Sequence, residues 1–127
     1  MIAAVLVTHN SQGFLPELLA SINRQTLQPE LKLAVDDNST DNTVELLTNN
    51  GFTVIPAQSG EHDTTTRIAQ NFVQVVSAAG EAGADTVIIG DHDDLWHPHR
   101  IRHQSQFLRT HEHVSMLASN EIGRAHV

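Results

Sequence analysis

The chain has 127 residues, of which 39% are hydrophobic and 17% charged, a composition typical of one globular domain and not of a disordered chain. Its formal net charge of -8 disfavours nucleic acid and anionic membranes as partners. The absence of cysteine excludes disulfides, thiolate zinc sites and a cysteine nucleophile. We expect no transmembrane segment, because the longest apolar run is Ile2–Val7, and we expect a cytoplasmic location, free or at the cytoplasmic face of the membrane.

The first half of the chain alternates apolar runs with helical patterns, as in α/β folds. The continuous apolar run Ile2–Val7 predicts a strand buried on both faces of a parallel sheet. Apolar residues at helical spacing predict a helix over Leu15–Ile22, with Pro16 in its first turn. Leu31–Val35 predicts a second strand. A second helix, ending near Gly51, carries Val44, Leu46 and Leu47 and takes its caps from Ser39, Thr40 and Asp41.

The second half continues the same alternation. Phe52–Ile55 predicts a third strand and Thr86–Ile89 a fourth. Between them, a long amphipathic helix ends at Gly80 and Gly83, and its apolar positions are Ile68, Phe72, Val75, Val76 and Ala79. A further helix begins at Pro98, and Val114–Ala118 predicts a last strand.

Polar residues follow three of the predicted strands. Parallel strands end at the same edge of a sheet, where open α/β sheets bind ligands. The segments expected at that edge are Thr8–Asn10, Asp36–Asn38 and Asp91–Asp94.

The acidic residues at this edge suit both a cation and a base. Asp91, Asp93 and Asp94 crowd three carboxylates together, and a bound Mg²⁺ or Mn²⁺ would relieve their repulsion. An acidic turn with one Asp capping the next helix is the alternative. An ionised Asp of the Asp36–Asp37 pair could accept the N3–H of a uracil or thymine ring, although such a pair also occurs in ordinary turns.

Four motifs resemble the family 2 nucleotide-sugar glycosyltransferases, which have the GT-A fold. In order along nearly the whole chain, they are Val7–Asn10, Leu18–Thr26, Val35–Asp41 and Asp91–Pro98. The resemblance implies a Rossmann-like, mostly parallel sheet flanked by helices. The Asp-x-Asp-Asp-x-Trp form at residues 91–96 is similar to the rhamnosyltransferase-like branch, which uses a thymidine-diphosphate sugar.

The resemblance also implies roles for individual residues. Thr8, His9 and Asn10 would contribute to the nucleotide-sugar site, with His9 where the family usually has Tyr. Asp37 would hydrogen-bond the pyrimidine, and Arg67 would lie near the base and phosphates, although a solvated helix-surface charge is its alternative. Asp93 would hold Mg²⁺ or Mn²⁺, and Asp91 would contact the ribose or the metal. Trp96 would stack on a sugar or base, or belong to the core.

The implied reaction moves a sugar from a UDP- or dTDP-sugar to the hydroxyl of a saccharide or lipid-linked acceptor, as in polysaccharide biosynthesis. A metal bridging both phosphates would stabilise the leaving nucleoside diphosphate. An inverting transfer also needs a carboxylate base, which in this family lies in the acceptor half, so no catalytic residue is assigned.

The last six residues, Ile122–Val127, match one reading frame of a common sequencing adapter. We therefore interpret residues 1–121 as the nucleotide-sugar-binding part of a chain truncated at its C-terminal side, and residues 122–127 as a non-native read-through tail. We expect such a fragment to be inactive and only marginally stable. The alternatives are a non-catalytic domain that binds a nucleotide diphosphate, and a metal-dependent phosphotransferase on a doubly wound sheet.

Overall fold

The computed structural model describes residues 1–58, 60, 63–90, 95–110, 118–119 and 125–126. It contains a parallel four-stranded sheet in the order β3-β2-β1-β4. The strands are β1 (Ile2–Thr8), β2 (Leu31–Asp36), β3 (Thr53–Pro56) and β4 (Thr86–Gly90). The helices are α1 (Leu15–Asn23), α2 (Thr43–Asn49), α3 (Thr64–Glu81) and α4 (Arg100–Thr110). The predicted α/β sheet flanked by helices is confirmed.

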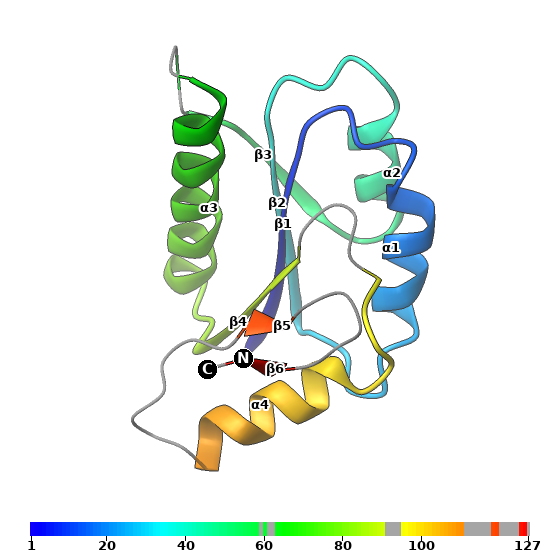
Figure 1. Cartoon of the computed structure of the whole chain (residues 1–127), viewed down its shortest axis with the longest axis vertical. Helices are drawn as coiled ribbons and strands as arrows, with labels where there is room; N and C mark the ends of the chain where they lie inside the picture. Colours follow the sequence, from blue (N-terminus) through cyan, green and yellow to red (C-terminus); the bar gives the residue numbers. More distant parts are fainter. Residues whose placement is uncertain (59, 61–62, 91–94, 111–117, 120–124, 127) are drawn as a thin grey trace.

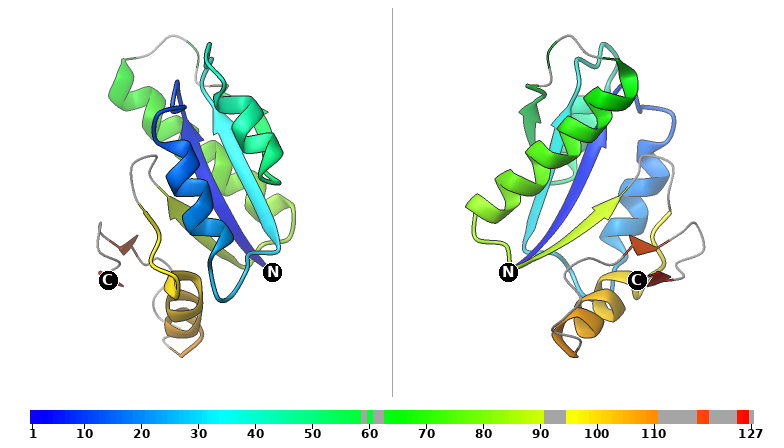
Figure 2. Two further views of the ribbon diagram at one scale, coloured as in Figure 1. Left: turned by 90° about the vertical axis from the view of Figure 1, so that its right-hand side faces the viewer. Right: turned by 60° about the vertical axis from the view of Figure 1, so that its left-hand side comes forward.

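The helices cover the two faces of the sheet unequally. Figures 1 and 2 show α1 and α2 on one face and α3 on the other, with α4 near the end where the strands begin. Beyond the main sheet, β5 (Ala118–Ser119) pairs antiparallel with β6 (Ala125–His126). Of the predicted last strand, Val114–Ala118, only Ala118 lies among the described residues, and it pairs with His126 and not with the main sheet.

Successive residues of the strands enter two different cores. Ala4 and Leu6 of β1 face α1 and α2, whereas Ala3 and Val5 face α3, as the two-residue period of a strand requires. Both cores are apolar, so the central strands are buried on both sides. This explains why the sequence of β1 is continuously apolar and not alternating.

Helix α3 covers its face of the sheet with fewer residues than the sequence pattern predicted. Val75 and Ala79 are fully buried, but Ile68 is 46% exposed and Val76 36% exposed, so the apolar positions of the amphipathic pattern extend beyond the core. Ile68 lies in the first turns, near the carboxyl ends of the strands, where it lines a cavity. The helix also runs past Gly80 and ends at Glu81. Its chain reversal comes at Gly83, whose φ of 102° places it in the left-handed region.

Trp96 belongs to the core, as one of the two interpretations of the sequence proposed. It is 3% exposed and packs with the residues of α1 and β1. The guanidinium carbon of Arg100 lies 4.3 Å from the centroid of its ring, and Arg100 Nη2 donates to the carbonyl of Ile89 at 2.7 Å. These contacts attach the start of α4 to the end of β4.

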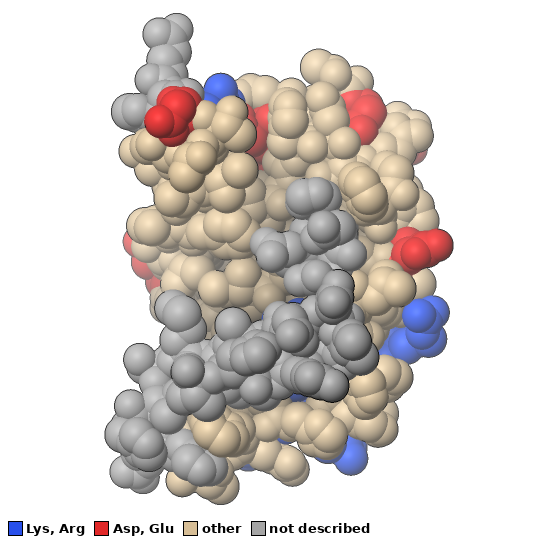
Figure 3. All heavy atoms as spheres, in the orientation of Figure 1, with Lys and Arg blue, Asp and Glu red and all other residues tan. Residues whose placement is uncertain are grey.

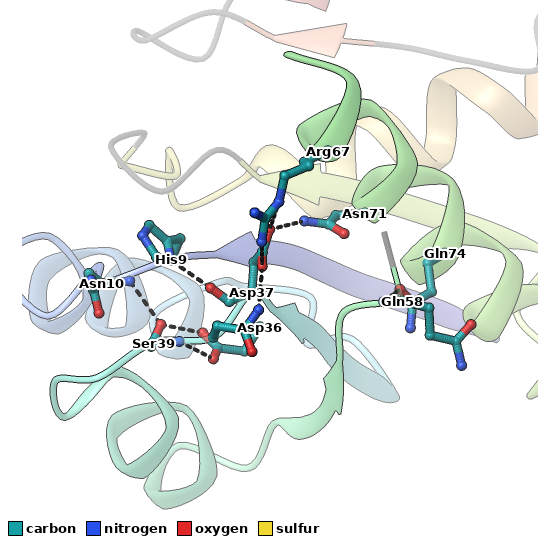
Figure 4. Close-up of polar contacts among 10 residues, drawn as sticks. His9, Asn10, Asp36, Asp37, Ser39, Gln58, Arg67, Asn71 and Gln74 are labelled. Atoms are coloured by element: carbon teal, nitrogen blue, oxygen red, sulfur yellow. Dashed lines mark hydrogen bonds and ion pairs between the residues drawn. The ribbon is translucent and has the colours of Figure 1, made fainter. Parts of the chain in front are cut away.

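The outer edge of β3 is occupied by a side chain of α3. The N–H of Ala57 donates to the carbonyl of Asp36 in β2. The carbonyl of Pro56 and the N–H of Gln58 therefore point away from the sheet, because successive residues of a strand alternate. There, Gln74 Nε2 donates to the carbonyl of Pro56 at 2.9 Å, and the N–H of Gln58 donates to Gln74 Oε1 at 3.0 Å (Figure 4). The amide of Gln74 thus makes the two hydrogen bonds that one residue of a neighbouring parallel strand would make.

Candidate functional site

The loops after β1 and β2 form one braced unit at the carboxyl edge of the sheet. The N–H of Asn10 donates to Ser39 Oγ at 2.8 Å, and the N–H of Thr40 donates to Asn10 Oδ1 at 2.8 Å. Asn10 has a φ of 46°, a left-handed conformation that asparagine tolerates better than most residues. Figure 3 shows acidic side chains along the top of the molecule, with a basic side chain between them.

Asp36 anchors the two loops from below. Its residue is 7% exposed, and its carboxylate accepts hydrogen bonds from the Thr8 hydroxyl at 2.7 Å and from the hydroxyl and N–H of Ser39 at 2.6 and 3.1 Å. These bonds satisfy a buried charge within the loops themselves. Of the two adjacent aspartates, Asp36 is therefore the one that holds the two loops together.

Asp37 is turned the other way, toward α3. Its carboxylate forms a two-point ion pair with Arg67, in which Nε donates to Oδ2 at 3.2 Å and Nη2 donates to Oδ1 (Figure 4). Asn71, one helical turn further on, donates to Oδ2 at 3.0 Å, and Asn38 donates to Oδ1 at 3.0 Å. The backbone of Asp37 is held too, because its N–H donates to the carbonyl of Thr8 at 2.8 Å.

A cavity of about 200 Å³ opens beside this carboxylate. His9 lies on one wall, and its Nδ1 is 2.5 Å from the carbonyl oxygen of Asp37. The residues that line the cavity are His9, Asp37, Thr64, Arg67 and Ile68. The cavity thus combines an anionic acceptor, a cation, an exposed imidazole face and an apolar side chain, a mixture suited to a flat heteroaromatic ring.

The structure brings together only part of the set predicted from the sequence. His9, Asp37 and Arg67 meet at the cavity, whereas Thr8 is 2% exposed and lies beneath it on Asp36, and Asn10 braces the loops. Asp91, Asp93 and Asp94 lie outside the described residues. Within the described ranges, no group of three or more His, Asp or Glu side chains is arranged to hold a metal ion.

Three residues at this site were absent from the prediction. Thr64 and Ile68 line the cavity, and Asn71, which is 1% exposed, donates to Asp37. Asn71 follows Arg67 by four positions, so both lie on the same face of a helix. That spacing could have indicated Asn71 once Arg67 was placed next to Asp37.

The surroundings of Asp37 predict how stability responds to acid. The hydrogen bonds from Arg67, with those from Asn71 and Asn38, hold the pKa of its carboxyl below the ordinary value of 3.8, against the opposing effect of burial. A depressed folded-state pKa contributes stability above the unfolded-state value, and this stability is lost as the pH falls through the folded-state pKa.

We therefore expect the wild type to lose stability more steeply than Asp37→Asn as the pH is lowered from 3.8. The measurement is denaturant unfolding at neutral pH and at several values below 3.8. Parallel losses in the two proteins would contradict the expectation. They would show that the ionised carboxylate is no better stabilised in the folded than in the unfolded state.

The chain matches a family model and several solved structures. The model described as "Glycosyl transferase family 2" matches residues 3–123. The structure of S. aureus TarS residues 1–349 in complex with UDP is 26% identical, with a TM-score of 0.63, over 87% of this chain and 32% of that one. A search of the curated proteins gave no match.

Two further structures show the same fold at lower identity. The mannosyltransferase PcManGT from Pyrobaculum calidifontis, in complex with GDP-Man and Mn²⁺, is 19% identical with a TM-score of 0.63, over 84% of this chain and 32% of that one. Glucosyl-3-phosphoglycerate synthase from Mycobacterium tuberculosis, with Mn²⁺, UDP and glucosyl-3-phosphoglycerate, is 18% identical with a TM-score of 0.57, over 80% and 37%. The chain thus spans about a third of these structures. Among the described residues, no helix has the length and apolar character needed to cross a membrane.

Proposed function

Since the chain belongs to glycosyl transferase family 2, we propose that it is the donor-binding part of an enzyme that transfers sugar from a nucleotide diphosphate. The observation that carries this proposal is the carboxylate of Asp37 in the wall of the cavity beside Arg67 and His9. An ionised carboxylate accepts the imide N–H of uracil or thymine, and the His9 ring offers a stacking surface. Arg67 supplies the positive charge that an overall acidic chain needs in order to attract a diphosphate.

The donor chemistry that fits this cavity is a UDP- or dTDP-sugar. Cytosine presents an acceptor where uracil presents its N3–H, so a carboxylate acceptor disfavours it. The TarS structure is a complex with UDP, a pyrimidine nucleotide, which supports a pyrimidine donor for this chain. The similarity of residues 91–96 to the rhamnosyltransferase-like branch supports the thymidine form.

We further propose that the donor binds with Mg²⁺ or Mn²⁺. The carboxylates of residues 91–94 follow Gly90 of β4, and β4 pairs in parallel with β1, so their segment starts at the edge of the sheet that carries the cavity. Oxygen donors of this type suit a hard divalent cation, and the two more distant structures contain Mn²⁺. Asp93, together with Asp91, would hold the ion, which when bound would stabilise the negative charge that develops on the leaving diphosphate.

Within this proposal, the residues of the chain orient the donor and do not activate the acceptor. Asp37 and His9 would fix the base, and Arg67, which lines the same cavity, would contact a phosphate. We propose an inverting transfer whose base belongs to the acceptor-binding part of a longer protein, because the chain spans about a third of the solved structures it matches. Family membership supports this reading over the phosphotransferase alternative.

The test of the proposal is calorimetric titration with UDP, dTDP and GDP, each with and without Mn²⁺. We expect UDP or dTDP to bind more tightly than GDP, and binding to strengthen when Mn²⁺ is present. Asp93→Ala is expected to remove that strengthening, at a cost of roughly 1–3 kcal/mol in the presence of the metal. Equal affinity of wild type and Asp93→Ala for UDP with Mn²⁺ would refute the assignment of the metal to this residue.

A further inference from the structure

The hydrogen-bonding capacity of Asp37 is already complete within the protein. Each oxygen of its carboxylate accepts two N–H bonds, Oδ1 from Arg67 and Asn38, and Oδ2 from Arg67 and Asn71. An ionised carboxylate offers about four acceptor positions in all. A base that donates an N–H to Asp37 must therefore replace one of the present donors.

The three donor residues differ in how easily they can leave. Asn71 is 1% exposed on the buried face of α3, so its amide is held by its surroundings. Asn38 is exposed and can leave too, but it donates from outside the set of residues that line the cavity. Arg67 lines the cavity, and a third of its side chain is exposed. Asp37 lines the same cavity but its side chain is only 10% exposed, so Arg67 is the donor that a ligand in the cavity can displace.

Displacement of Arg67 has a different cost for different ligands. A neutral nucleoside would break the ion pair and leave the guanidinium without an anion. A nucleoside diphosphate brings its own anion, which can take over the guanidinium with charge-assisted hydrogen bonds of the same kind. The exchange thus conserves the number of ion pairs only when phosphates are present.

We propose that the ion pair between Arg67 and Asp37 closes the base site until a nucleoside diphosphate exchanges it. The base N–H then takes the place of Arg67 on Asp37, and the guanidinium turns to the diphosphate. Arg67 is thereby a specificity-determining residue that disfavours nucleosides and favours diphosphates. This inference rests on the proposed nucleotide-sugar function.

The exchange predicts opposite effects of one substitution on two ligands. In Arg67→Ala, uridine should bind more tightly, by roughly threefold or more, because an acceptor position on Asp37 becomes free. UDP with Mn²⁺ should bind more weakly, by roughly tenfold, because the diphosphate loses its cation. Arg67→Lys retains a charge without the two-point pair, so both changes should have the same signs and smaller sizes. Arg102→Ala removes an equal charge from an exposed position on α4 and should leave both affinities unchanged.

Calorimetric titration of the full chain with uridine and with UDP measures these changes, and circular dichroism confirms that each variant is folded. If Arg67→Ala does not fold, Arg67→Lys carries the same test. Weaker or unchanged uridine binding in the folded Arg67 variants would overturn the exchange. Failure of the proposed function looks different: the wild type itself would then show no base-dependent binding at all. That result would overturn both proposals.

Discussion

Asp37→Ala is expected to abolish base-dependent binding of UDP and to destabilise the fold. The carboxylate is the one anionic acceptor among the residues that line the cavity, so its loss should weaken binding by about 1–3 kcal/mol. The substitution also leaves Arg67 without its ion pair and the buried amide of Asn71 without an acceptor. The Oδ1 atom of Asn71 already lacks a partner among the described residues, so both ends of this amide would be unsatisfied.

The expected loss in unfolding free energy is about 2–4 kcal/mol, toward the lower end because Arg67 can turn partly to water. Denaturant unfolding at neutral pH measures this loss, and titration with UDP and GDP measures the loss of selectivity. Glu45→Ala is the control, since it removes an exposed carboxylate from the first turn of α2, outside the cavity. A variant that retains both stability and preference for UDP would show that Asp37 neither supports the loops nor contacts the base.

Gly90→Ala is expected to produce the largest loss of stability of any glycine substitution in the described part of the chain. A Cβ at residue 90 would lie 2.7 Å from Cζ2 of Trp96 and 2.8 Å from Cδ2 of Leu6. Both neighbours are core side chains, with Trp96 3% and Leu6 0% exposed, so neither can move aside into solvent. Forcing one methyl into such a core costs about 1–3 kcal/mol.

The measurement is thermal and denaturant unfolding of Gly90→Ala beside Gly80→Ala. Gly80 lies within α3 and has open space where a Cβ would go. Alanine there should be neutral or stabilising by up to about 1 kcal/mol, because glycine is a poor helix former. Equal stability of the two variants would show that the ring of Trp96 does not pack on Gly90 as described.

The sequence predicted the order of the elements because their apolar patterns differ in period. The run in β1 could be assigned to a strand buried on both faces, and the helical spacing of Leu15, Leu18, Leu19 and Ile22 to a helix covering it. Boundaries were less certain. Phe52 was assigned to β3, but it precedes the strand and packs with α1 and α2. An apolar side chain at the end of a loop gives the same pattern as one at the start of a strand.

The sequence could also place two aspartates at the ligand-binding edge, but it could not distinguish their roles. Asp36 and Asp37 point in opposite directions because adjacent residues of an extended chain alternate. Which of them faces the loops depends on the hydroxyls of Thr8 and Ser39, which close on Asp36. Two of the partners of Asp37, Arg67 and Asn71, come from α3, 30 and 34 residues further along the chain, and the packing of that helix brings them to the carboxylate.

Ile68 shows why the amphipathic pattern overstated the core. Periodicity identifies one side of a helix, but it does not say how far along the helix the sheet extends beneath it. The first turns of α3 pass the ends of the strands, where an apolar side chain faces the cavity and not the sheet. An apolar residue that breaks the expected burial near a ligand-binding edge is therefore itself an indication of a site.

The side-chain amide of Gln74, which occupies the outer edge of β3, limits where further strands can join the sheet. A strand that approached β3 at this position would have to compete with an amide that is already tethered to α3 at high effective concentration, and Pro56 offers it no N–H. Additional strands, from a longer form of this chain or from a second molecule, would accordingly extend the sheet beyond β4. Any such addition would pair with the strand that directly precedes the proposed metal carboxylates in the chain.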